Sequence, residues 1–201
     1  MSYEIGPVEL DFLKEAGNIG AGHAATALSK LTGRRMDMSV PSASLIPFED
    51  ILLDEEEEAA SAVVFKLSGA LTGWMIFMLP AAHADRLALQ MTGGTHPASV
   101  SLMQSAFAEA GNIVCGAYVS AVSDLTGKAL SLSPPQQAAD MKSALIAEAL
   151  SAVAPEADAA LMIDACLTGD SLSSGMQGSL LIVPEPGSLQ QLFPFAGEAN
   201  E

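Results

Sequence analysis

The stretch DFLKEAGNIGAGHAATALSKLTGR, residues 11–34, recurs as SAFAEAGNIVCGAYVSAVSDLTGK at residues 105–128. The same offset of 94 residues relates Pro41, which follows the first stretch, to Pro135, which follows the second. An internal repeat of this length is typical of two related half-structures. The sequence therefore predicts one domain over residues 1–201, built from pseudo-symmetric halves at about 8–92 and 100–193.

Each repeat has the hydrophobic spacing of an amphipathic α-helix. In the first, from about Val8 to Leu31, one stripe collects the residues that we expect to face the core: Leu13, Ala16, Gly17, Gly20, Ala24, Ala27, Leu28 and Leu31. The second helix has a corresponding stripe: Phe107, Val114, Tyr118, Val122 and Leu125. Gly33 and Gly127 are placed to end the two helices as C-terminal caps.

Opposite the core stripe, each helix carries a row of polar residues. Asp11, Glu15 and Asn18 are spaced i, i+4 and i+7, so they lie one above another on the outward face. The corresponding residues of the second helix are Ser105, Glu109 and Asn112. For one copy alone, a solvated helix face is the ordinary interpretation. The recurrence of the row in both copies favours a shared function.

Glycines inside the two helices need a compensating reason, because each costs about 1 kcal/mol relative to alanine. The five positions are Gly17, Gly20, Gly22, Gly111 and Gly116. Two reasons stay open, namely close packing of the helix against its neighbours or a smooth surface that another protein approaches.

The rest of the chain predicts strands and short helices in a similar order in each half. We expect strands that end near the motif prolines, at Arg35–Pro41, continuing toward Phe48, and at Ala129–Pro135. We expect hairpins at Ala60–Leu67 with Gly73–Leu79, and at Ala157–Leu167 with Met176–Val183. Short helices are expected at Ala82–Met91, Leu189–Leu192 and Asp140–Leu150. The joint between the halves is expected at Thr92–Ser99, and residues 197–201 are expected to be a disordered tail.

The charge balance excludes several classes of function. Eight Lys and Arg residues against 24 Asp and Glu residues give a net charge of −16, which repels phosphate backbones and anionic lipid. The N-terminus lacks the basic and apolar regions of a signal peptide, and the apolar run around Gly73–Ala82 is too short to cross a bilayer. We expect a cytoplasmic protein with no nucleic-acid partner and no membrane insertion.

Metal-binding and thiol chemistry are also unsupported by the sequence. His23, His83 and His96 lack the spacing of zinc ligands, and Cys115 and Cys166 are expected to be reduced thiols in an apolar interior. The acidic run from Glu49 to Glu58 lacks the glycine and asparagine turns of an EF-hand loop, so we expect a solvated, mobile loop. No cofactor is expected in this chain.

The outward row is suited to half of an active site. An asparagine neither titrates near neutrality nor acts as a nucleophile, and no His or Cys accompanies it in the row. A carboxamide can nevertheless hold a water molecule in line with a phosphorus atom whose electrophile and metal are supplied by another protein. A carboxylate one turn away can bind a lysine of that protein.

The tandem pattern Asp/Ser, three residues, Glu, two residues, Asn, 22 residues, Pro resembles the CheC/CheX/FliY phosphatases of bacterial chemotaxis, over essentially the whole chain. The doubling resembles the CheC branch. The resemblance implies an α+β fold, with a six-stranded antiparallel sheet and two long motif helices side by side on one face. It also implies that the chain dephosphorylates the aspartyl phosphate of a CheY-like response regulator, with Mg²⁺ held by that regulator.

The same resemblance assigns roles to the motif residues. Asn18 and Asn112 would each orient the attacking water in one of two sites, while Glu15 and Glu109 would contact the regulator's active-site lysine. The supporting motif positions are Asp11, Pro41, Ser105 and Pro135. Gly20 becomes Val114 and Asp11 becomes Ser105 in the second copy, departures that can make the two sites unequal. CheC-branch members also bind the receptor deamidase CheD, but no residues here match that contact.

Two other interpretations compete with a phosphatase. A non-catalytic adaptor of the chemotaxis or flagellar-switch apparatus has the same architecture but no need for Glu and Asn on both helices. A small-molecule binding domain needs a concave polar pocket, which nothing in the sequence predicts. The sequence leaves open which receiver domain is the substrate, whether both sites are active, and the oligomeric state.

Overall fold

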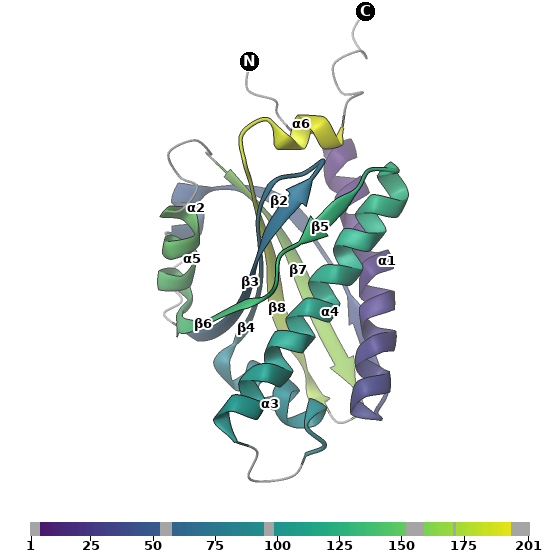
Figure 1. The fold of residues 1–201 in the computed structure, drawn as a ribbon, viewed down its shortest axis with the longest axis vertical. Coiled ribbons are helices and arrows are strands. Elements are labelled where there is room, and N and C mark those ends of the chain that lie inside the picture. The colour runs from purple at the N-terminus through teal and green to yellow at the C-terminus, as the bar shows by residue number, and fades with distance from the viewer. Residues whose placement is uncertain (1–4, 53–57, 95–98, 152–158, 171, 194–201) are drawn as a thin grey trace, which may run out of the picture.

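The computed structural model describes residues 5–52, 58–94, 99–151, 159–170 and 172–193, and its elements follow a similar order twice (Figure 1). The first half contains α1 (Pro7–Thr32), β1 (Met36–Ser39), β2 (Ala43–Pro47), α2 (Phe48–Leu52), β3 (Ala59–Gly69), β4 (Gly73–Pro80) and α3 (Ala81–Met91). The second half contains α4 (Val100–Thr126), β5 (Leu130–Leu132), β6 (Gln136–Met141), α5 (Lys142–Ser151), β7 (Ala159–Gly169), β8 (Leu172–Pro184) and α6 (Ser188–Leu192). The two halves therefore resemble each other in the order of their elements as well as in the sequence of their motif helices.

One antiparallel sheet joins the two halves. Its order is β1-β7-β8-β4-β3-β5, with β2 also paired to β7 and β6 also paired to β3. Eight strands thus occupy six positions, where six strands were expected, because each edge position holds two short strands in line. The edge strands of each half pair with the hairpin of the other half, so the halves are interleaved.

A β-bulge divides the first edge position at the motif proline. Ser39 pairs with Cys166 and Ala43 pairs with Ile163, so three residues of the edge lie opposite two residues of β7. Pro41 is the middle one of the three. A bulge tolerates proline because the ladder requires no backbone donor at that point.

The second edge position is divided in the same way. Leu132 pairs with Leu67 and Gln136 pairs with Val64, again with three residues opposite two. Pro135 is the last of these three, and the strand resumes after it as β6. The sequence predicted the end of a strand here but missed its continuation.

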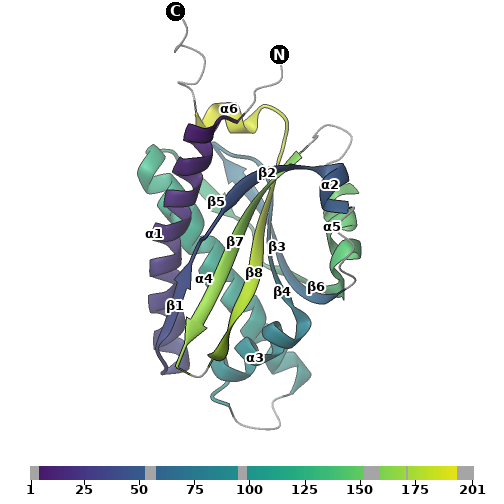
Figure 2. The ribbon, with the colours of Figure 1, turned by 180° about the vertical axis from the view of Figure 1, so that it is seen from behind.

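The two faces of the sheet are covered unequally. α1, α3 and α4 pack over one face, around a core that includes Leu13, Phe65, Phe77 and Phe107. α2 and α5 cover part of the other face around a smaller cluster centred on Ile146. Figure 2 shows this second face toward the viewer, with α2 and α5 on one side of it and β1 at the opposite edge.

Most expected elements form within two residues of their predicted bounds, but several predictions need correction. Leu31 and Leu125 are 52% and 44% exposed, because they lie in the last helical turn before the left-handed caps Gly33 and Gly127. Ala27 is half-buried. The acidic run is helical where α2 includes residues 49 and 50, while residues 53–57 lie outside the described ranges. The expected tail, residues 197–201, and residues 95–98 of the expected joint also lie outside them.

Candidate active site on the paired helices

The polar rows lie on the outer surface of the two motif helices, as predicted. In α1, Asp11, Glu15 and Asn18 are all exposed, while Leu13 and Ala16 between them are fully buried. In α4, the corresponding Ser105, Glu109 and Asn112 are also exposed. The 3.6-residue period therefore places the two rows on the solvent side of one helix layer.

The helices that carry the rows lie side by side and run in opposite directions (Figure 1). They approach each other closely at Gly20, where an added Cβ would lie 2.9 Å from the Cα atom of Tyr118. The buried hydroxyl of Tyr118 donates a hydrogen bond of 3.5 Å to the backbone oxygen of Leu13. Gly20 therefore permits the contact that fixes one motif helix against the other.

The five helical glycines divide between the two reasons that the sequence left open. Gly17 and Gly111 lie against valine side chains of the sheet side, and Gly20 lies against the backbone of α4. An added Cβ at Gly22 or Gly116 would meet nothing within 4 Å. These last two glycines follow Asn18 and Asn112 by one turn, so each row ends in a bare patch of helix surface.

A hydrogen bond links Asn18 to the motif proline segment. The backbone N–H of Val40 donates to Oδ1 of Asn18 over 3.1 Å. Of the two ends of a carboxamide only the oxygen can accept a hydrogen bond, so this contact fixes which end faces the sheet. Both Nδ2–H donors and one lone pair of Oδ1 remain for a ligand. The spacing between the motif asparagine and proline is thus explained locally, because the bulge at Pro41 brings Val40 to Asn18.

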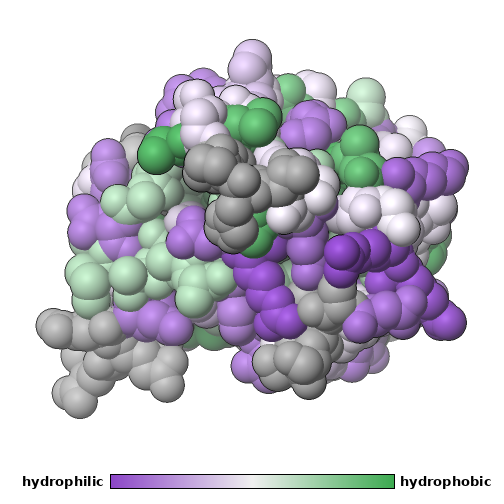
Figure 3. Space-filling view, turned by 90° about the horizontal axis from the view of Figure 1, so that it is seen from below, coloured by the Kyte–Doolittle hydropathy of each residue, from purple (hydrophilic) through white to green (hydrophobic). Residues whose placement is uncertain are grey.

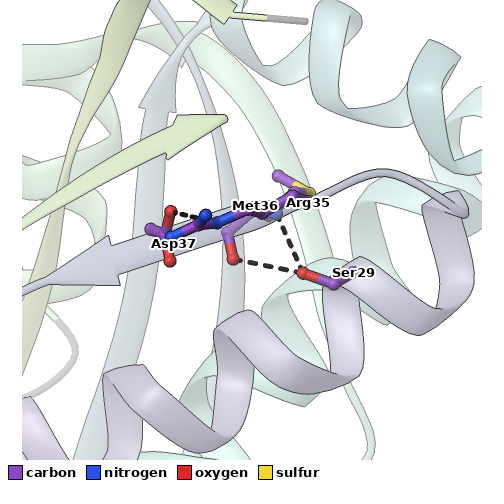
Figure 4. Close-up of polar contacts among 4 residues, drawn as sticks. All are labelled: Ser29, Arg35, Met36 and Asp37. Carbon is purple, nitrogen blue, oxygen red and sulfur yellow. Dashed lines mark hydrogen bonds and ion pairs between the residues drawn. The ribbon is translucent and has the colours of Figure 1, made fainter. Parts of the chain in front are cut away.

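The far end of the same edge strand is tied to α1 as well. Ser29 Oγ accepts from the backbone N–H of Met36 over 2.9 Å and donates to its oxygen over 3.1 Å (Figure 4). Arg35 and Asp37 form an exposed ion pair on either side of Met36. Ser29 recurs as Ser123 at the offset of 94 residues, but the repeat alone indicates no role for it. Its two hydrogen bonds hold the start of β1 against α1.

These two ties do not recur in the second copy. Within the described ranges, neither Asn112 nor Ser123, the counterpart of Ser29, has a hydrogen-bond partner for its side chain. The second bulge is attached to the sheet instead: Ser133 Oγ accepts from the backbone N–H of Lys66 over 2.9 Å. Ser105 also differs from Asp11, because its hydroxyl donates to the Ser101 backbone oxygen of its own helix.

The titratable groups near the rows supply no obvious nucleophile. Burial raises the pKa of the Cys115 thiol and that of the Tyr118 hydroxyl, so both stay protonated near neutrality. His23 is exposed, five residues beyond Asn18. Cys115 is buried as expected, but Cys166 is only half-buried, because it lies on β7 next to the bulge. Both cysteines are free.

Exposed apolar side chains extend both rows by one turn, which sequence reasoning missed. Val8 is 78% exposed and Leu102, its counterpart at the offset of 94, is 50% exposed. Each precedes Asp11 or Ser105 by three residues and so lies on the same helix face. An apolar residue at the same position of both copies is a sequence signal that could have indicated this extension. On the end of the molecule seen in Figure 3, hydrophobic residues lie scattered among hydrophilic ones.

Other possible sites are weaker. A cavity of about 380 Å³ lies on the other face of the sheet, where Asp164, Cys166 and Lys142 are among the residues that line it. Across the described ranges, no three His, Cys, Asp or Glu side chains are grouped so that they could hold a metal ion. None of the helices in those ranges combines the length and the hydropathy that a bilayer crossing requires.

Comparisons with known proteins match this chain along most of its length. The model of the CheC-like family matches residues 8–45, and that of the chemotaxis phosphatase CheX matches residues 61–160. A Bacillus subtilis (strain 168) protein, "CheY-P phosphatase CheC", is 30% identical over 196 residues, and the match covers 94% of this chain and 94% of that protein.

Solved structures share the fold. FliY of Thermotoga maritima matches with a TM-score of 0.72 at 21% identity, covering 90% of this chain and 92% of that one. The FliM middle domain of H. pylori matches with a TM-score of 0.65 at 10% identity, covering 94% of this chain and 98% of that one. At these identities the likeness concerns the arrangement of helices and strands.

Proposed function

Because the chain belongs to the CheC family, we propose that it is a cytoplasmic phosphatase that hydrolyses the aspartyl phosphate of a CheY-like response regulator. The observation that carries the proposal is the complete Glu and Asn row on both motif helices, exposed on one side of the molecule. The name of the Bacillus subtilis relative, a CheY-P phosphatase, supports the choice of substrate class.

In this mechanism the receiver domain supplies most of the chemistry. It carries the phosphorylated aspartate, and it would hold the Mg²⁺ that neutralises charge on the phosphoryl group. A water oxygen attacks the phosphorus atom, the bond from phosphorus to the aspartyl oxygen breaks, and the products are the free carboxylate and inorganic phosphate. This chain would contribute orientation of the water, which lowers the entropic part of the barrier.

Asn18 and Asn112 are the groups that would orient the water. The Nδ2–H₂ group can donate to the water oxygen, or Oδ1 can accept one of its protons, without any change in charge. Exposure of both side chains leaves them accessible to a second protein. One receiver domain would dock on each helix, since the two rows belong to different helices.

Glu15 and Glu109 would hold the receiver domain in register. Each lies one turn before its asparagine, and each is exposed. An ionised carboxylate there can form a charge-assisted hydrogen bond to the lysine of a receiver active site. These glutamates would act mainly in binding, because an exposed ion pair contributes to association and register rather than to bond cleavage.

The competing interpretation is an adaptor that binds a receiver domain without hydrolysis. The shared fold of the FliM middle domain does not separate the two, because it concerns architecture alone. The Glu and Asn pairs do favour catalysis, since docking by itself requires no amide at the same place on two helices.

Phosphate release from a panel of phosphorylated receiver domains, with and without this protein, tests the proposal. We expect at least one CheY-like domain to release phosphate faster with catalytic amounts of the protein. Binding of the same domain without any acceleration would contradict the phosphatase and support the adaptor.

A further inference from the structure

We propose that the backbone N–H of Val40 is a positioning group for Asn18, and that Pro134 denies Asn112 the same support, so that the site on α1 turns over faster than the site on α4. This inference rests on the proposed function and concerns the relative rates of its two sites. Three observations carry it: the hydrogen bond, the rigidity of its donor, and the residue at the equivalent position.

The hydrogen bond holds the carboxamide of a side chain that otherwise extends from a helix surface. Val40 N–H donates to Asn18 Oδ1 over 3.1 Å, within the usual range for this type of bond. It joins residues 22 positions apart, so the rotamer of Asn18 depends on the edge strand and not on its helix alone. A side chain that is already oriented loses less entropy when it binds the attacking water.

The donor itself is fixed on both sides. The Val40 side chain is only 5% exposed, and it packs against Gly17, where an added Cβ would lie 3.1 Å from the valine methyl groups. Two residues further on, Ser42 Oγ donates to the carboxylate of Asp164 on β7, and Ser42 backbone oxygen accepts from Asp164 N–H over 3.1 Å. The bulge is therefore held by the sheet while its N–H points at Asn18.

The second copy cannot form this bond, because the residue equivalent to Val40 has no backbone N–H. The segment Ser39, Val40, Pro41 corresponds to Ser133, Pro134, Pro135 at the same offset of 94 residues. Proline has no backbone N–H, so Pro134 has nothing to donate. In agreement, within the part of the chain that the structure describes, the carboxamide of Asn112 has no partner. The two sites thus present the same asparagine side chain, but among the described residues only that of Asn18 accepts a backbone hydrogen bond.

A reciprocal exchange of Val40 and Pro134 tests the inference in chains with one active site. In the Asn112→Ala background, only the α1 site works. There Val40→Pro removes the donor and recreates the Ser-Pro-Pro sequence that the second bulge already accommodates. We expect kcat to fall about fivefold with KM nearly unchanged, which is the effect of losing one ordinary hydrogen bond in the reacting complex.

Val40→Ala is the matched control, because it also loses packing against Gly17 but keeps the N–H. We expect it to retain most of the kcat that Val40→Pro loses, in proteins whose thermal unfolding confirms a native fold. Equal kcat values for the two variants would overturn the role of the N–H.

In the Asn18→Ala background, only the α4 site works. Pro134→Val there creates the Ser-Val-Pro sequence found at residues 39–41 and introduces a donor. We expect kcat to rise several-fold, again with KM nearly unchanged. A kcat that stays at the level of the parent chain would overturn the claim that Pro134 limits this site.

Amide hydrogen exchange tests the bond without any receiver domain. The Val40 amide lies outside the strand ladder, so its protection should depend on Asn18, and Asn18→Ala should accelerate its exchange about fivefold or more. Unchanged exchange would overturn the inference. A protein that accelerates no receiver domain but shows this coupling would instead contradict the proposed function, so the two failures are distinguishable.

Discussion

The two motif copies of this chain present the same exposed row but differ in what lies beneath it. In the first copy, α1 is tied to its edge strand at both ends, through Asn18 with Val40 and through Ser29 with Met36. In the second copy, α4 has neither tie, and its bulge is attached to β3 through Ser133. A duplicated motif can therefore keep its exposed chemical groups while the hydrogen bonds that hold them differ.

The strongest way to break the comparison is to remove the amide from both copies. We expect the double variant Asn18→Ala, Asn112→Ala to reduce phosphate release to the receiver domain's own rate, because nothing else in either row orients water. Phosphate release at saturating receiver domain measures this. The matched control is Lys30→Ala with Asp124→Ala, an exposed pair at equivalent positions whose removal leaves the net charge unchanged. Acceleration that survived in the double variant would exclude water positioning by these amides.

Next in size is the loss of the two glutamates. Glu15→Gln with Glu109→Gln should raise KM several-fold and weaken its dependence on salt, because the variant loses an electrostatic contact to the receiver lysine. Asp50→Asn with Asp124→Asn changes the net charge equally at exposed positions outside the rows and serves as control. If the glutamate variant instead kept its KM and lost kcat, the glutamates would belong to the chemical step.

Much of this site was predictable from sequence, because helical period and repetition are local signals. The 3.6-residue spacing put both rows outside and most of the core stripe inside, and both capping glycines adopt the left-handed conformation. Residues near the helix ends were less predictable, as Leu31 and Leu125 show, since exposure there depends on where the sheet stops.

What the sequence did not predict depends on contacts between distant segments. Nothing in the repeat indicates that Val40 reaches Asn18, because the bulge that brings them together exists only when β1 and β2 pair with β7 of the other half. For the same reason the continuation of the second edge strand into β6 was missed. The pairing of each edge with the hairpin of the other half was likewise not predictable, because the hydrophobic period of one strand does not indicate its partner.

A smaller effect should separate the glycines that pack from those that face solvent. Gly20→Ala should destabilise the fold by about 1–3 kcal/mol, because the new Cβ would lie 2.9 Å from the Tyr118 backbone. Gly22→Ala should stabilise it by up to about 1 kcal/mol, since its Cβ meets nothing and alanine favours helix. Denaturant unfolding measures both. Similar changes in the two variants would mean that the helices are not in close contact at Gly20.

The smallest expected effect is that of pH. The asparagine amides do not titrate, and burial raises the pKa of Cys115 and of Tyr118, so all four groups keep one charge state between about pH 6 and 8. The stability that depends on the two protonated groups is fully present in this range and falls only at alkaline pH, as the pH rises past their unfolded-state pKa values. The acceleration, divided by the receiver's own profile, should be nearly flat for the wild type and for His23→Ala. A step that disappears with His23 would reveal a general base.

Whether the support of the asparagine sets the rate is tested most simply by comparing the two single-site chains. Asn112→Ala leaves only the α1 site and Asn18→Ala leaves only the α4 site, and kcat of each is measured with the same phosphorylated receiver domain at saturation. We expect the α1 site to be faster by about fivefold, the effect of one orienting hydrogen bond. Equal kcat values, or a faster α4 site, would contradict it.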